Sequence, residues 1–274
     1  MTGAAVASGR GKPMNYRLKV VLLQLALLVF LLALWWFFTD VYALRPKYII
    51  PDPGAVWTEM KFGLFGKSPD GKLTMSVINS LRRVAIGFSI AVGSGVVVGM
   101  VLSVSKVFRD VVGGYFTAIQ SIPSIAFVPL ALLLLGLNER AVLAVVIVEG
   151  FIPTALGVSA ALLNVPPALR TAGRTLGVKG LGLVTRVTLP ASLPNLVGGL
   201  RTAWSFSWRA LIGGELLTTN PGLGQLLEIG RNTANVALVV STIICIGVVG
   251  VFFDTIISSL ESRIRHNYGL EGES

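Results

Sequence analysis

The sequence predicts an all-α integral membrane protein with about six transmembrane helices, each requiring about 20 apolar residues. Of its 274 residues, 53% are hydrophobic and only 13% are charged, whereas a soluble domain usually has about 25% charged residues. Several apolar runs approach the length that crosses a bilayer. Because most of the surface must face lipid, this composition excludes a soluble globular domain.

The formal net charge of +10 does not indicate nucleic-acid binding. The basic residues lie between and beside the apolar runs, where positive charge determines topology. Cys245 is the only cysteine and His266 the only histidine, so the chain cannot form an internal disulfide or a cysteine-based metal site. We expect it to bind no metal or cofactor and to lack acid–base catalysis by histidine.

Residues 1–17 form a small, polar and basic tail, which we place in the cytoplasm, and the first span covers about 18–38. Val41-Tyr42-Ala43 resembles a weak signal-peptidase site. The apolar run of about 20 residues exceeds the 7–15 residues of a signal peptide. We therefore expect an uncleaved anchor, which begins a first segment over 18–74.

Residues 40–79 form the longest polar connection. Prolines at its start keep the chain extended. From Pro53 to Phe65, Val56, Met60 and Leu64 recur at helical spacing. This pattern predicts a short amphipathic helix that lies against the membrane surface.

Five further spans follow, within a core that we place at 75–265. The third contains Pro123 and Pro129, which should kink or interrupt it. Lysine and arginine are more numerous on the side of the N-terminus, so we expect both termini, including a 266–274 tail, in the cytoplasm. The predicted spans cover about 84–104, 110–137, 141–163, 191–217 and 236–260.

A polar, basic hairpin at residues 164–190 separates the fourth and fifth spans. Pro166-Pro167 suits a helix start, and Gly177 suits a helix end. Leu169, Ala172 and Leu176 recur at helical spacing, which places Arg170 and Arg174 on other faces of the helix. A second helix from Gly180 to Thr188, closed by Pro190, would complete a protruding helix–turn–helix. The alternative is an interfacial helix whose arginines contact anionic lipid.

The spacing within this hairpin resembles the cytoplasmic loop of permease subunits in binding-protein-dependent ABC importers. That loop reads Glu-Ala-Ala, three residues, Gly, nine residues, Ile-x-Leu-Pro. Ala172, Gly177, Leu189 and Pro190 match at the same intervals, and Val187 replaces isoleucine. Gly173 replaces the second alanine, and Thr171 stands in the place of the glutamate.

The resemblance extends over roughly residues 75–265. Three segments look like the nitrate, taurine and aliphatic-sulfonate branch of these permeases: Ser121–Leu130, Ala203–Ala210 and Pro221–Gly224.

This resemblance implies a pathway formed by two permeases in a bacterial plasma membrane. Two ATPase subunits would hold ATP and Mg, and an extracytoplasmic binding protein would deliver the solute. The sequence has no Gly-x-x-x-x-Gly-Lys-Ser/Thr run, so ATP hydrolysis belongs to another chain. The hairpin would dock on the ATPase through Arg170, Thr171, Ala172, Gly173, Arg174, Gly177, Leu189 and Pro190.

Charged residues inside the predicted spans are candidates for function. Arg209 and Glu149 lie well within the fifth and fourth spans. Arg201, Trp204, Trp208 and Glu215 fall on one face of the fifth, so we predict that all six residues line the translocation path. The alternative is a buried ion pair of Arg209 with Glu149 or Glu215.

The leading hypothesis is a permease for a small oxyanion that Arg209 and Arg201 help across, with sulfonate or taurine ahead of nitrate or bicarbonate. We expect a homodimer. One alternative is import of another solute, such as a thiamine precursor. A second is an ion-coupled carrier that uses Glu149 and Asp254 and needs no ATPase.

Overall fold

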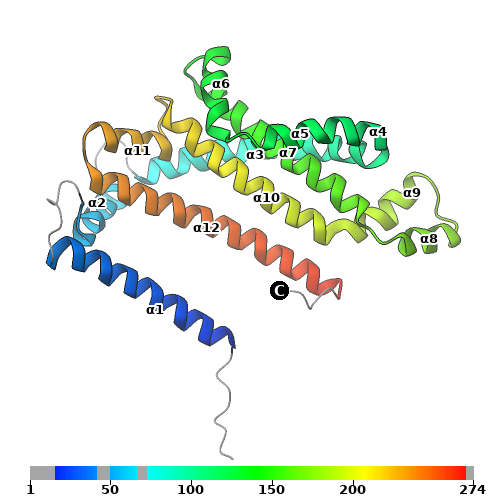
Figure 1. Ribbon diagram of the computed structural model, residues 1–274, viewed down its shortest axis with the longest axis horizontal. Coiled ribbons are helices and arrows are strands. Elements are labelled where there is room, and N and C mark those ends of the chain that lie inside the picture. Colours follow the sequence, from blue (N-terminus) through cyan, green and yellow to red (C-terminus); the bar gives the residue numbers. More distant parts are fainter. Residues whose placement is uncertain (1–15, 42–49, 67–72, 270–274) are drawn as a thin grey trace, which may run out of the picture. The chain divides into compact units, whose positions relative to one another are not determined.

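The computed structural model describes residues 16–41, 50–66 and 73–269. Within these ranges the chain forms helices and turns and no strand (Figure 1), which confirms the predicted all-α class. It divides into two compact units, Met1–Thr58 and Glu59–Ser274. Most of the N-terminal tail, the residues Tyr42-Ala43 of the possible cleavage site and the end of the C-terminal tail lie outside the described residues.

The first unit contains the predicted anchor. Helix α1 (Tyr16–Trp36) continues into a π-helical turn, Phe37–Val41. The Trp35 indole N–H donates to the carbonyl of Pro51 over 3.2 Å.

Helix α2 (Pro53–Phe65) has the predicted bounds and crosses the division between the units. Val56 on it is buried, but Trp57, Phe62 and Phe65 are exposed. Because these apolar side chains occupy other faces too, the prediction of a single apolar face is wrong.

The second unit is built on α3 (Leu73–Val104), α7 (Glu139–Leu163), α10 (Leu189–Leu216) and α12 (Val236–Asn267). Helix α7 packs along both α3 and α10. Small residues permit this close approach: a Cβ on Gly95 would lie 2.7 Å from Thr154, and one on Gly157 would lie 3.1 Å from Gly199. The core includes Val84, Val146, Trp204, Trp208 and Leu211.

The predicted third span is broken. Helix α4 (Lys106–Phe108), a π turn (Arg109–Gly113) and α5 (Gly114–Gln120) lead to a short 3₁₀ turn and α6 (Phe127–Leu135), with an 88° bend between the halves. Pro123 lies at the break. Pro129 lies in the first turn of α6, where no N–H is needed, so it interrupts nothing.

Among the described residues, four helices are long and apolar enough to cross a membrane, and the bent pair would make a fifth. Helix α10, the predicted fifth span, has 28 residues but is more polar, with three charged side chains. It packs against α3, α7, α11 and α12. The protein is therefore an all-α membrane protein, and a crossing by α10 remains a prediction.

Two boundaries and one helix differ from expectation. Helix α3 begins at Leu73 rather than near Val84, so Arg82 and Arg83 lie inside it. Helix α12 extends to Asn267 rather than ending near Leu260. Helix α11 (Leu223–Asn232) was not predicted and lies between the ends of α10 and α12.

Candidate functional site

The first arm of the hairpin (residues 164–190) is α8 (Pro167–Thr175). Pro167 opens it, where its missing N–H costs nothing. Gly177 has a φ of +83°, and the N–H of Val178 donates to the carbonyl of Gly173 over 3.0 Å. Such a left-handed glycine just past a helix is a common termination, as the sequence predicted.

The second arm continues into α10. Helix α9 (Leu181–Leu183) is followed by a π turn, Val184–Thr188, in which the N–H of Leu189 donates to the carbonyl of Val184. Pro190 is the second residue of α10, so the prediction that it closes the hairpin is wrong. A proline in the first helical turn lacks only an N–H that the turn leaves unpaired.

The two arms touch at Gly173. It is buried, and a Cβ there would lie 3.0 Å from both Leu183 and Val187. Arg170, expected to point outward, turns back and donates to the carbonyl of Leu162 at the end of α7. The hairpin is therefore joined to α7 by its first arm and to α10 by its second.

The exposed surface of α8 is partly apolar. Leu169 and Leu176 are exposed, Leu176 to 82%, and Thr171, Ala172 and Arg174 are exposed beside them. The predicted apolar line of Leu169, Ala172 and Leu176 is thus exposed in the part of the chain that the structure describes. An exposed apolar surface with a basic residue is typical of a protein or membrane contact.

A cavity of about 250 Å³ lies where α5 and α6 separate. The connecting segment 120–125 forms one side of it. Glu149 from α7, together with Phe206 and Arg209 from α10, forms the rest. This is the place where the structure brings two predicted path residues, Glu149 and Arg209, together.

The two charges in this cavity are not directly paired. The Arg209 Nε donates to the carbonyl of Ser205 over 3.0 Å, and its guanidinium carbon lies 4.8 Å from the centre of the Phe206 ring. Glu149 is 6% exposed, yet it makes no hydrogen bond or ion pair with any residue that the structure describes. The predicted Arg209–Glu149 ion pair is therefore replaced by a shared cavity.

Glu215 lies elsewhere and is fully buried. It accepts from the Arg83 guanidinium at 2.7 Å, from the Ser80 hydroxyl at 2.7 and 2.9 Å, and from the N–H of Gly224 at 3.0 Å. The prediction that Glu215 pairs with Arg209 is therefore wrong. The prediction that Glu215 lines the path is not supported, because these contacts enclose its carboxylate.

Sequence reasoning missed Arg83, which also contacts Glu139 at 3.2 Å and the carbonyl of Pro221 at 2.9 Å. A signal was present: Arg83 precedes Gly87, Ala91 and Gly95 at intervals of one helical turn, so it lies on the buried stripe of α3.

The other three predicted path residues hold helices together. Arg201 pairs with Asp254 of α12 through two hydrogen bonds of 2.7 and 2.8 Å. Trp204 and Trp208 are buried, with ring centroids 5.9 Å apart, and Trp204 lies 5.0 Å from Phe253. None of them lines the charged cavity.

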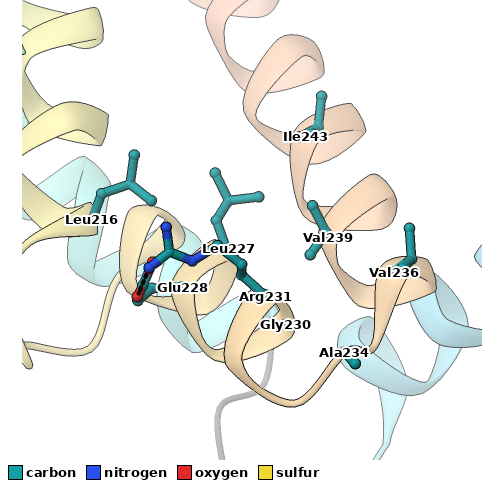
Figure 2. A pocket seen from close by; sticks show the side chains of 9 residues that line it. All are labelled: Leu216, Leu227, Glu228, Gly230, Arg231, Ala234, Val236, Val239 and Ile243. Carbon is teal, nitrogen blue, oxygen red and sulfur yellow. Dashed lines mark hydrogen bonds and ion pairs between the residues drawn. The ribbon is translucent and has the colours of Figure 1, made fainter. Parts of the chain in front are cut away.

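A second cavity, of about 550 Å³, opens between α11 and the start of α12 (Figure 2). Its lining is largely apolar. Glu228 and Arg231, its charged residues, bond to each other at 2.6 Å. This cavity therefore offers no free charge to a solute.

Comparison with known proteins identifies the chain. Residues 91–266 match the family described as "Binding-protein-dependent transport system inner membrane component". An ABC transporter permease protein of Methanocaldococcus jannaschii is 27% identical over 90% of each chain. A bicarbonate transport system permease of Synechococcus elongatus is 28% identical over 93% of this chain and 94% of its own length. A nitrate import permease of Synechocystis is 28% identical over 71% of each.

The fold has solved counterparts. The inward-facing MetNI methionine ABC transporter matches 71% of this chain and 95% of its own with a TM-score of 0.58 and 24% identity. The family's permeases are not themselves catalytic, and a partner ATPase hydrolyses ATP. The chain therefore belongs to the family of binding-protein-dependent inner membrane components: it is a permease subunit of an ABC importer, which works with an ATPase and a solute-binding protein.

Proposed function

We propose that this permease forms the path for a small oxyanion, such as a sulfonate, taurine, nitrate or bicarbonate. Arg209 carries this proposal, because its guanidinium lines a cavity and is paired with no carboxylate among the described residues. Relatives named for nitrate and bicarbonate import support it. A weak anion contact suits a pathway, since tight binding would delay release.

In this proposal the hairpin receives the movement of the ATPase. The exposed surface around Leu176 and Arg174 docks on that subunit, and the second arm transmits the displacement directly into α10. Two copies of the chain form the path. The family description supports a plasma-membrane location, and the placement of basic residues supports an orientation with the hairpin and both termini in the cytoplasm.

Transport by the reconstituted importer tests the substrate. The permease is copurified with its partner ATPase and assayed in proteoliposomes with the binding protein. We expect one of these oxyanions to stimulate ATP hydrolysis. Arg209→Gln should lower uptake about tenfold, equivalent to about 1.4 kcal/mol of barrier, without releasing the ATPase.

Arg231→Gln is the matched control, because Arg231 pairs with Glu228 away from the charged cavity. Its uptake should equal that of the unaltered protein. Unchanged uptake by Arg209→Gln would contradict the assignment of Arg209 to the path.

The alternative of an ion-coupled carrier finds less support. It requires Glu149 and Asp254 as exchangeable carboxylates, and Asp254 is held by Arg201 in a two-bond ion pair. Transport that persists without the ATPase would favour it.

A further inference from the structure

We propose that the cavity at the break between α5 and α6 binds a small zwitterion, with its ammonium group at Glu149 and its oxyanion at Arg209. This inference rests on the proposed function and narrows the substrate to one chemical class: an amine joined to a sulfonate or carboxylate by a short apolar linker.

Glu149 has no hydrogen-bond or ion-pair partner among the described residues. The Glu149 side chain belongs to a residue that is only 6% exposed, and a carboxylate in such surroundings costs free energy unless another group compensates it. Asp254 and Glu215, two other carboxylates within the predicted spans, each bind an arginine. Glu149 binds no described residue and lines a cavity instead. A cationic group entering that cavity would supply the missing partner.

Arg209 lines the same cavity. Its Nε bond to Ser205 leaves the two terminal nitrogens of the guanidinium without a described partner. Since no ion pair closes the gap between Arg209 and Glu149, a solute can lie between opposite charges. An anion without an amine would meet the Glu149 carboxylate, and an amine without an anion would meet Arg209. A zwitterion avoids both repulsions.

The cavity is large enough to hold a small zwitterion. A cavity of about 250 Å³ equals the liquid volume of roughly eight water molecules at about 30 Å³ each. Taurine, with about seven non-hydrogen atoms, fits that space. Gln120, Ser121 and Ser124 add polar groups along the wall, and Ile122 and Ile125 add apolar surface for the linker.

Binding to the purified permease–ATPase complex in nanodiscs, without the binding protein, tests the proposal. Radiolabelled taurine is displaced by unlabelled taurine, ethanesulfonate, which lacks the amine, or ethylamine, which lacks the sulfonate. We expect taurine to bind at least tenfold more tightly than either competitor. This comparison uses the unaltered protein and therefore needs no variant that must fold.

Two variants test which group of the zwitterion each residue binds. Glu149→Gln should bind taurine and ethanesulfonate equally, and Arg209→Gln should bind taurine and ethylamine equally. Glu228→Gln, in the apolar cavity beside α11, should leave all three affinities unchanged.

Equal binding of taurine and ethanesulfonate to the unaltered complex, or a taurine affinity that Glu149→Gln leaves unchanged, would overturn the zwitterion site. The oxyanion path would still stand in that case if Arg209→Gln weakened both sulfonates. The absence of any effect of Arg209→Gln on sulfonate binding and uptake would refute the path as well.

Discussion

At the residue scale, the fate of each charge depends on whether a partner lies within reach. Glu215 and Arg83 are both almost fully buried and satisfy each other, with Ser80 and the N–H of Gly224 completing the shell. Gly224 has no room for a side chain, because a Cβ would lie 2.6 Å from that of Glu215. Glu149 has no such shell among the described residues and lines a cavity instead.

This contrast predicts the stability of variants. Arg83→Ala leaves a buried carboxylate uncompensated, and the loss should be about 3–5 kcal/mol of unfolding free energy. Thermal unfolding of the detergent-purified protein measures it. The double variant Arg83→Leu, Glu215→Leu should recover part of the loss, because it removes both charges. A single variant as stable as the unaltered protein would contradict the structural role of the pair.

The same residues show the limit of sequence reasoning. Helical periodicity placed Glu215 on the face of Trp204 and Trp208, and all three are indeed buried. Its partner could not be deduced, because Arg83 lies more than a hundred positions away and their meeting depends on the packing of α3 against α10.

At the element scale, apolar runs located the long helices, and most boundaries agree within a few residues. The bend at Pro123 was predicted as a kink, but its 88° angle depends on the neighbouring helices. Helix α11 was missed because Gln225, Glu228 and Arg231 make it too polar to resemble a span. Its formation relies on packing against α10 and α12.

The turn of the hairpin predicts a loss of coupling without a loss of insertion. Gly177 has a left-handed conformation that β-branched residues seldom adopt. Gly177→Val should therefore disturb the hairpin at a cost of about 1–2 kcal/mol. Solute-stimulated ATP hydrolysis should be abolished, while membrane insertion measured by fractionation stays normal.

Gly93→Ala is the control, since a Cβ there meets nothing within 4 Å and the backbone is helical. Normal transport by Gly177→Val would refute the role of the hairpin as the ATPase contact.

A substitution on the exposed surface of α8 can distinguish a loss of ATPase docking from a loss of folding. Leu176 is 82% exposed, so Leu176→Asp should leave the thermal unfolding of the isolated permease unchanged. It should weaken copurification of the ATPase at least tenfold if this surface is the contact. Phe65→Asp, at an equally exposed position outside the predicted spans, should retain the ATPase. Full retention by Leu176→Asp would place the contact elsewhere.

At the scale of the whole molecule, the hairpin and α11 adjoin opposite ends of α10 (Figure 1). A helix of 28 residues spans about 42 Å at 1.5 Å per residue, which exceeds the roughly 30 Å of a bilayer core. The two elements should therefore lie on opposite sides of the membrane if α10 crosses it. The sequence supported this orientation only through the distribution of lysine and arginine. The basic residues of the 40–79 connection, on the predicted outer side, weaken that signal.

Single-cysteine labelling checks the arrangement. Cys245→Ser removes the only native thiol, and Thr175→Cys or Arg231→Cys then introduces one at either end. In intact cells an impermeant maleimide should label the Arg231 site, and the Thr175 site should react only after permeabilisation. Labelling of both from outside would reject the predicted orientation.

The π turn runs directly into α10, so a movement of α10 as a rigid rod would make it act as a lever. Its far end is pinned at Glu215, about 39 Å from Leu189, whereas Arg209 lies only about 9 Å from the pin. A swing of about 10° would thus carry the hairpin through about 7 Å and shift the Arg209 backbone by less than 2 Å. If the hairpin receives the movement of the ATPase, as proposed, a large displacement there would reach Arg209 as a small one.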